Sequence, residues 1–236
     1  MKLTNPAEVV STSPYRFFLY GEPGVGKTTL IGDAPSPLIL AAPPDEVTSI
    51  RDSAAQVLTV ESWDDAVAAV DLAVKGSPKL QPYETVIIDT LTHVRSFATQ
   101  AALEANRDKF SQAVWTEANR KLINLVNELL KCPKPVVLIG HHRYEKNDDG
   151  SIRRVLPDFG EGFLRVFLAR MNAAFYYRVA GGKRELLLTA VPGIDVKNRY
   201  GLPDKLVNPT YADLLSAIQQ YKEKAIETSS ESTNQG

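Results

Sequence analysis

The chain has a single cysteine, Cys132, among its 236 residues. One cysteine excludes an internal disulfide and a metal site made of several thiolates, and we expect a buried structural thiol here. No apolar run is long enough to span a bilayer. The first residues, Met-Lys-Leu-Thr-Asn-Pro, lack the apolar segment of a secretory signal. We therefore expect a cytoplasmic protein that makes no membrane contact.

An excess of charge of either sign is also missing. The 27 Lys and Arg residues are balanced by 28 Asp and Glu residues, and the formal net charge is −1. This balance gives no overall signal for nucleic-acid binding, although local basic patches remain compatible with it. A hydrophobic content of 44% and a charged content of 23% are typical of a globular protein, and the length suits one α/β domain.

Composition along the chain predicts three parts. Residues 1–14 are polar and interrupted by proline, so we expect an N-terminal arm. Residues 15–226 would form the folded core. Residues 227–236 are rich in Ser, Thr, Asn and Gln, which predicts a disordered tail.

Within the core, short apolar runs alternate with segments of helical periodicity. This alternation predicts an α/β fold with a mostly parallel sheet flanked by helices. A turn at 180–183 between two apolar runs adds a C-terminal antiparallel hairpin. The expected strands are 16–20, 37–41, 56–60, 85–89 and 136–140, with hairpin strands at 173–179 and 184–190. The expected helices are 62–74, a two-part region at 94–132, 159–171 and 211–225. In the second part of 94–132, apolar residues recur at helical spacing from Trp115 onwards, and we expect this stripe to pack in the core.

The first expected strand leads into the pattern G-x-x-x-x-G-K-[ST], the phosphate-binding loop. In such a loop the glycines let backbone N–H groups turn towards phosphates. Lys27 would reach the β- and γ-phosphates of ATP, and the Thr28 hydroxyl would bind Mg²⁺. The residues predicted to bind the nucleotide here are Gly21, Glu22, Pro23, Gly24, Val25, Gly26, Lys27, Thr28 and Thr29.

Asp89 closes the apolar run Val86–Asp89. A carboxylate at the end of a buried parallel strand suits the second Mg²⁺-side ligand, acting through water. The alternative is a helix cap formed by Asp89 or Thr90. Because ligands bind at the carboxyl ends of strands in such sheets, Asp89 and the phosphate-binding loop would share one edge.

Two further strand ends carry polar residues suited to hydrolysis. Asp45 and Glu46 follow the second strand, and we favour Glu46 as the group that positions water against the γ-phosphorus. A solvated acidic turn is the alternative. His141 and His142 follow the strand 136–140, and neighbouring residues there face opposite ways. One of them, with His141 preferred, would sense the γ-phosphate.

Lys197 and Arg199 stand two residues apart in an expected extended segment. Side chains at that spacing point to the same side. They could reach the phosphates of a neighbouring subunit as fingers supplied in trans, since such cations stabilise the charge of phosphoryl transfer. A solvated basic turn is the alternative.

Four segments together resemble the RecA-type, core-only ATPases of bacteriophages, which are grouped with AAA-type ATP-binding proteins. The segments are Tyr20-Gly-Glu-Pro-Gly-Val-Gly-Lys-Thr28, Val86-Ile-Ile-Asp-Thr-Leu91, Leu138-Ile-Gly-His-His142 and Val196-Lys-Asn-Arg-Tyr-Gly-Leu-Pro203. Some members of that family are single-strand DNA annealing recombinases.

The resemblance implies a RecA-like P-loop NTPase that binds ATP and Mg²⁺, forms a ring or filament of identical subunits, and acts on single-stranded DNA. A single-strand-binding protein is a possible further partner. The location implied is the cytoplasm of a phage-infected or lysogenic host. Residues 42–46, Ala-Pro-Pro-Asp-Glu, depart from the family's acidic residue flanked by glycines. Slow hydrolysis would fit this departure.

The resemblance also indicates where DNA would bind, namely the loops 143–160 and 181–184. The candidate contacts are Arg143, Lys146, Arg153, Arg154 and Lys183. Cations with an aromatic residue, Tyr144, suit a groove that tracks a DNA backbone and stacks some bases. Acidic residues also stand in the first loop, so an ordinary polar loop is the alternative.

Two other functions stay open on the sequence. A nucleotide-dependent assembly switch or loader would bind a protein partner in place of DNA, and its oligomeric state would change with ATP while DNA had no effect. A small-molecule kinase usually needs an Arg-rich lid, for which only Arg153 and Arg154 stand nearby.

Overall fold

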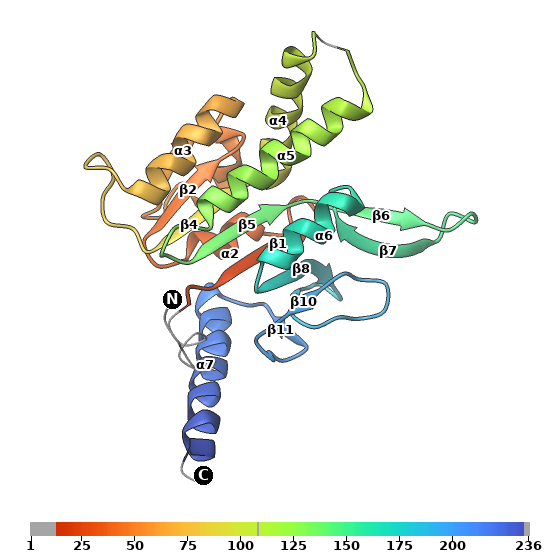
Figure 1. The fold of residues 1–236 in the computed structure, drawn as a ribbon. Helices are drawn as coiled ribbons and strands as arrows, with labels where there is room; N and C mark the ends of the chain where they lie inside the picture. Colours follow the sequence, from red (N-terminus) through yellow and green to blue (C-terminus); the bar gives the residue numbers. More distant parts are fainter. Residues whose placement is uncertain (1–12, 108, 234–236) are drawn as a thin grey trace.

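The apolar runs predicted as parallel strands are neighbours in one sheet of the computed structural model, which describes residues 13–107 and 109–233 (Figure 1). Each strand begins and ends within about one residue of its predicted bounds. These strands are β1 (Arg16–Gly21), β2 (Pro37–Ala41), β3 (Gln56–Thr59), β4 (Thr85–Asp89) and β5 (Val136–Gly140).

Within the described residues the sheet has nine strands in the order β11-β9-β8-β1-β5-β4-β2-β3, with β10 also paired to β8. The strands from β8 to β3 are parallel to their neighbours. The remaining strands pair antiparallel, which confirms the predicted C-terminal hairpin of β8 and β9. Their bounds are β8 (Ala173–Ala180), β9 (Lys183–Leu187), β10 (Lys197–Asn198) and β11 (Lys205–Val207).

Helices cover both faces of the sheet, as predicted. Successive strand side chains point to opposite faces, so the buried residues form two large clusters. Phe18 and Leu138 belong to the cluster under α3 (Trp63–Lys75), α4 (Leu91–Ala105), α5 (Gln112–Leu129) and α6 (Glu161–Arg170). Phe17 and Val137 belong to the cluster under α2 (Lys27–Gly32), the 3₁₀ segment η1 (Pro44–Ile50) and α7 (Tyr211–Thr233).

The predicted helical region 94–132 consists of α4 and α5, but two details were wrong. First, α4 begins at Leu91 because the Thr90 side chain caps it by accepting the N–H of His93. Second, Trp115 is 45% exposed and packs against exposed Phe110, with ring centroids 5.9 Å apart and ring planes tilted by 51°. Trp115 lies beside the buried stripe that Val114, Ala118 and Leu122 form on α5.

The predicted loop 143–160 is also different in the structure. Most of it forms a two-stranded antiparallel ribbon of β6 (His142–Lys146) and β7 (Ile152–Pro157), which projects beyond the sheet (Figure 1). The polar turn between the strands was predicted, and Gly150 there has a φ of 82°. The strands were missed because charged residues obscure their period-two alternation.

The chain ends give a third difference. The sequence predicted a disordered tail from 227, whereas α7 continues to Thr233; residues 234–236 lie outside the described residues. Glu, Ser and Thr can extend a helix that is already nucleated. Residues 1–12 of the predicted N-terminal arm also lie outside the described residues. At Ser13 the backbone carbonyl accepts a hydrogen bond from Lys222 of α7 at 2.7 Å.

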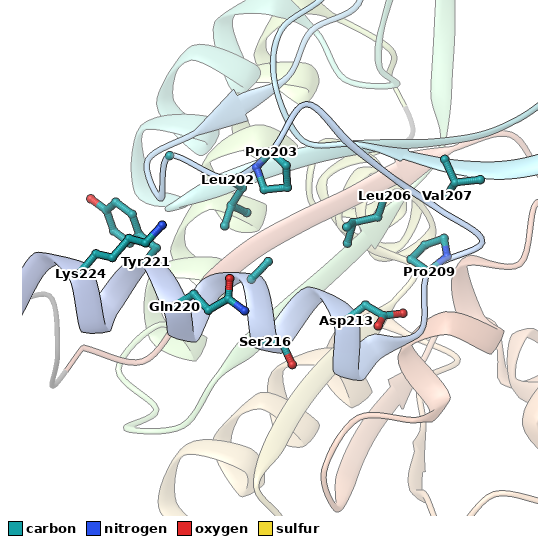
Figure 2. A pocket seen from close by; sticks show the side chains of 12 residues that line it. Leu202, Pro203, Leu206, Val207, Pro209, Asp213, Ser216, Gln220, Tyr221 and Lys224 are labelled. Atoms are coloured by element: carbon teal, nitrogen blue, oxygen red, sulfur yellow. The ribbon is translucent and has the colours of Figure 1, made fainter.

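A groove with a volume of 540 Å³ runs between α7 and the segment 201–209 (Figure 2). Figure 2 shows Leu202, Pro203 and Leu206 on one side and Ser216 and Gln220 on the other. None of the predicted site residues lines this groove. No helix among the described residues is long and apolar enough to cross a membrane.

The start of the phosphate-binding loop depends on a close backbone approach at Gly21. A Cβ atom there would lie 2.0 Å from the carbonyl oxygen of Tyr177, its partner on β8. We expect Gly21→Ala to lower the free energy of unfolding by about 3 kcal/mol, the upper range for overpacking a core. Urea denaturation would measure the loss.

Gly162→Ala is the matched control, because a Cβ atom at Gly162 would meet no atom within 4 Å. We expect no loss of stability from that change. Equal stability of the two variants would show that β1 and β8 can separate at this point without cost.

Candidate nucleotide-binding site

The phosphate-binding loop connects β1 to α2. Gly24 and Gly26 have φ angles of 75° and 95°, in the region that favours glycine, and Gly26 precedes the first residue of α2. Lys27 begins α2 and is only 6% exposed. Its Nζ donates to the carbonyls of Gly21 at 3.1 Å and Glu22 at 2.8 Å. The ammonium group is therefore held inside the loop.

Burial lowers the pKa of Lys27, and the carboxylates of Asp89, Glu46 and Glu22 oppose that shift. Three carboxylates thus act on one buried ammonium group. Two backbone carbonyls are weak partners for such a group compared with an anion. The site is suited to receive a phosphate.

Asp89, at the end of β4, and Thr28, after Lys27, come together as predicted. The Thr28 hydroxyl donates to Asp89 Oδ2 at 2.6 Å. Asp89 Oδ1 is buried and has no hydrogen-bond partner among the described residues. Burial, followed by the charge of Glu46, raises the pKa of Asp89 to about 6, although the Thr28 bond and Lys27 act in the opposite direction.

The Asp89 and Thr28 pair fits Mg²⁺, because an unsatisfied buried carboxylate oxygen and a hydroxyl are hard oxygen donors. Mg²⁺ commonly takes one or two protein ligands and completes its shell with phosphate and water. No group of three or more His, Cys, Asp or Glu residues suited to a metal occurs within 13–107 and 109–233. The alternative that Asp89 or Thr90 caps a helix also holds in part, because Thr90 is the N-cap of α4.

The two neighbouring histidines after β5 face different surroundings, as expected. Burial lowers the pKa of His141, and Lys27 and His93 add to that effect. Because the charge of Lys27 acts on His141, we place the His141 side chain on the side of the phosphate-binding loop. His142 packs instead against Tyr144 and Tyr176, with ring centroids 4.6 and 6.2 Å away.

Glu46 lies on η1, and its charge affects both Lys27 and Asp89. It also stands 3.8 Å from Nδ1 of His93, measured at Oε1. Asp45 is exposed, and its backbone carbonyl accepts the Thr48 hydroxyl at 2.6 Å. Of the two acidic residues, Glu46 is therefore the one beside the phosphate-binding loop.

The ribbon of β6 and β7 touches the phosphate-binding loop directly. The Tyr144 hydroxyl donates to Glu22 Oε1 at 2.5 Å, and this bond is the main reason that the pKa of Tyr144 is raised. At the other side of the ribbon, Arg154 donates to both carboxylate oxygens of Asp195, at 2.7 and 2.6 Å. The Asp195 carbonyl accepts the hydroxyl of Tyr20 on β1. The ribbon is thus tied to β1 and to the loop that follows it.

The cations predicted to contact DNA are dispersed and mostly paired. Arg143 and Arg153 both reach Glu145, at 3.4 and 2.9 Å, while Arg154 is bound to Asp195. Lys146 lies at the ribbon tip and Lys183 at the start of β9, both exposed. Neither lysine forms an ion pair within the described part of the chain. Of the five predicted contacts, the two lysines are thus available to bind an anion, whereas the charge of the three arginines is largely compensated.

Lys197 and Arg199 lie at the other end of the sheet. Lys197 pairs with Ala174 near the start of β8, whereas Gly21 pairs with Tyr177 further along the same strand. Since β1 and β8 are parallel, this register places both cations away from the phosphate-binding loop of their own subunit. Lys197 donates to the Leu168 carbonyl at the end of α6, and Arg199 is exposed.

A hollow lies beside the loop on the side of β8 and β9. A Cβ atom on Gly26 would meet Arg184 Nε at 3.2 Å, so this guanidinium lies against the loop. The hollow has a volume of 200 Å³, and its lining includes Thr29, Arg184 and Asn208.

Sequence reasoning missed His93 and the bond between Tyr144 and Glu22. A signal for His93 existed, because a helix that starts right after a site carboxylate brings its first turn to the same edge. No sequence signal predicted the Tyr144 contact, since 122 residues separate its two partners.

A phosphate-binding loop at the carboxyl end of a parallel strand, with a buried carboxylate beside its threonine, defines a P-loop nucleoside-triphosphate-binding protein. The AAA domain family matches residues 13–200, and the chain belongs to this family, whose domain indicates nucleotide binding and ATPase activity. No curated protein matches the chain.

The raised pKa of Asp89 makes a prediction about stability. Its pKa is about 6 in the fold and about 4 in an unfolded chain. The fold disfavours the charged form, so stability is highest below the unfolded pKa and falls as pH rises from about 4 to about 6. Asp89→Asn removes that loss. We expect the nucleotide-free variant to be more stable than wild type by about 1–3 kcal/mol at pH 7.5, and nearly equal to it at pH 4.

Thermal unfolding at the two pH values, with and without MgATP, checks this expectation. MgATP should raise the melting temperature of wild type far more than that of Asp89→Asn. A nucleotide-free wild type that is the more stable protein at pH 7.5 would contradict the buried-charge account.

Proposed function

We propose that the protein is an ATP-hydrolysing, Mg²⁺-dependent RecA-like ATPase that acts as a homo-oligomer on single-stranded DNA in bacteriophage recombination or annealing. The observation that carries the proposal is the hydrogen bond between Tyr144 and Glu22. It joins the phosphate-binding loop to a projecting ribbon, which is the element that the family resemblance associates with DNA.

The sheet order supports one orientation for ATP. Asp89 lies on the β4 side of β1, while the hollow with Thr29, Arg184 and Asn208 lies on the β9 side. With its γ-phosphate beside Lys27 and Asp89, the nucleotide would direct its nucleoside towards that hollow. Arg184 would then offer a planar cation to the base or to the α-phosphate.

The chemistry follows from the side chains that would surround the γ-phosphate. Lys27 would exchange its two carbonyl partners for phosphate oxygens, and Thr28 with Asp89 would hold Mg²⁺, which neutralises phosphate charge when bound. Glu46 would accept a proton from the attacking water. His141, kept neutral by the lowered pKa, would donate or accept one hydrogen bond at the γ-phosphate.

Nucleotide binding would reach the ribbon through Glu22. This residue lies inside the loop, so phosphate entry changes the charge around its carboxylate and hence the bond to Tyr144. His142 is the first residue of β6, one residue beyond His141, and it packs against the Tyr144 ring within the ribbon itself. The bond from Tyr144 to Glu22 is therefore the contact through which the state of the loop would reach the ribbon.

DNA binding is proposed for the outer surface of that ribbon. Tyr144 is 38% exposed and Ile152 55% exposed, so both could stack on or contact bases. Lys146 and Lys183 would contact phosphates. The ion pairs of Arg143, Arg153 and Arg154 would have to open, or those residues would serve the ribbon's structure.

Lys197 and Arg199 are proposed to reach the ATP of a neighbouring subunit. Their position at the far end of the sheet suits such a role, since a group that faces away from its own site can face another copy's site. This arrangement would make hydrolysis depend on oligomer formation.

The compensated charges favour a second candidate, a nucleotide-dependent switch or loader that binds a protein partner. With three of the five predicted DNA-contact cations in ion pairs, the electrostatic attraction for DNA would be small. The same contact of Glu22 with Tyr144 would then control a protein-binding surface.

ATP hydrolysis by wild type and Lys27→Ala, with and without single-stranded DNA, separates these functions. We expect DNA to stimulate hydrolysis by wild type, and Lys27→Ala to abolish it, because the variant loses the ammonium that binds the β- and γ-phosphates. DNA affinity should fall steeply with salt, since phosphate contacts release counterions. A rate of hydrolysis that DNA does not change, with no DNA bound at low salt, would favour the switch that binds a protein partner.

Tyr144 has two proposed roles that two substitutions distinguish. Tyr144→Phe keeps the ring but removes the hydroxyl that bonds Glu22, so DNA affinity should persist while stimulation of hydrolysis by DNA is lost. Tyr144→Ala should lose both. Fluorescence anisotropy with labelled DNA measures affinity, and phosphate release measures stimulation. Full stimulation in Tyr144→Phe would show that the bond to Glu22 carries no signal.

A further inference from the structure

His93 lies between two groups of the nucleotide site, although nothing in the local sequence marks it as a site residue. Its Nδ1 is 3.8 Å from Glu46 Oε1. Its ring stands at 83° to that of His141, with 6.0 Å between the centroids. The cluster thus brings together η1, the first turn of α4 and the end of β5.

Thr90 fixes the position of His93 from two sides. Thr90 Oγ1 accepts the backbone N–H of His93 at 3.3 Å and lies 3.2 Å from its Nδ1. The cap therefore holds both the backbone and the ring edge, so that Nδ1 faces the side on which Glu46 lies. A side chain constrained in this way loses little further entropy when it forms a bond.

Glu46 has no comparable support from its own segment. Its backbone N–H bonds the Pro43 carbonyl at 3.2 Å, but within the described residues His93 is its side chain's only ion-pair partner. The side chains of Glu46 and His93 are 29% and 39% exposed, so water reaches both. The charge of Glu46 acts on both Lys27 and Asp89, so its carboxylate lies on the side of the phosphate-binding loop.

We infer that His93 is the positioning residue for Glu46 in ATP hydrolysis, an assignment that rests on the ATPase function proposed above. With the proton on Nδ1, that N–H can be shared between Thr90 Oγ1 and one carboxylate oxygen of Glu46, which leaves the other carboxylate oxygen free for water. The present 3.8 Å is too long for a hydrogen bond, and catalytic contacts often shorten only when substrate is bound.

The step balances without a further reactant. Glu46 accepts one proton from water as the water oxygen bonds to the γ-phosphorus. The bond from that phosphorus to the β–γ bridging oxygen breaks, its electron pair stays on ADP, and the products are ADP and phosphate. His93 exchanges no atom with the substrate, because its proposed part in the step is its contact with the Glu46 carboxylate.

A double-mutant cycle on the full-length protein tests the inference, using wild type, His93→Ala, Glu46→Gln and the double variant. His93→Ala should lower kcat by about 10- to 100-fold, the range for misplacing a reacting group by about 1 Å. KM and the Kd for MgATP should stay within about twofold, because ground-state binding is not involved. In the Glu46→Gln background the same change should have no further effect on kcat.

Two further variants keep the result interpretable. His93→Asn offers an amide N–H near the position of Nδ1 and should recover part of kcat, which a purely structural role would not predict. Gln100→Ala, on an exposed turn of the same helix, controls for general effects on α4. Melting temperatures show that each variant is folded.

Equal losses of kcat from His93→Ala in both backgrounds would overturn the inference, as would a raised KM with kcat unchanged. Full activity of Glu46→Gln would overturn the roles of Glu46 and His93 while leaving the ATPase function intact. A wild-type protein that binds MgATP without hydrolysing it would overturn the ATPase function itself and the inference with it.

Discussion

The burial of β1 between two parallel neighbours is the constraint on which the rest of the site depends. β8 and β5 pair with β1 along its two edges, and buried side chains cover both faces. A strand held on four sides cannot shift its register without exposing core residues. The carboxyl end of β1 therefore holds the phosphate-binding loop in a fixed position at the edge of the sheet. Because Gly21 has no Cβ atom, β8 can approach this end of β1 closely at Tyr177.

The site at this edge concentrates charges that the fold alone does not favour. Lys27 is almost fully buried with two carbonyls as partners, and Asp89 keeps one carboxylate oxygen without a partner among the described residues. Both groups have pKa values shifted towards their neutral forms by burial. A bound anion and a divalent cation would relieve both penalties together, so ligand binding and stability are coupled here. Buried charged groups with shifted pKa values, gathered in one place, also distinguish a nucleotide site from an ordinary surface turn.

Contacts between distant segments extend the influence of the loop beyond the phosphates. Glu22 bonds Tyr144 on the ribbon, while Glu46 stands near His93 on α4. Each contact joins the edge of the sheet to a different element, the ribbon in one case and the first turn of α4 in the other. The ribbon has few buried residues, since only Val155, Leu156 and Pro157 are buried, so its orientation depends on polar bonds at its base. Bonds that involve the loop are the ones that a nucleotide can alter.

The family description and the sequence features agree on the nucleotide site, and the structure corrects several elements around it. The strands β1, β2, β4 and β5 were predictable because continuous apolar runs encode buried parallel strands locally. The ribbon was not, because Arg143, Glu145 and Arg154 made its alternation look like a polar loop. Trp115 was assigned to the core by spacing alone, although only the neighbours of a helix decide which of its faces is covered.

The sequence by itself determined the chemistry of the phosphate-binding loop, the carboxylate after β4 and the alternation of strands and helices. Those properties reside in residues that are close along the chain. Tertiary structure decided that Glu46 and not Asp45 lies beside the loop, that His93 belongs to the same edge, and that Lys197 and Arg199 lie at the opposite end of the sheet. Such proximity depends on strand order, register and helix caps, which bring together side chains that no local pattern relates.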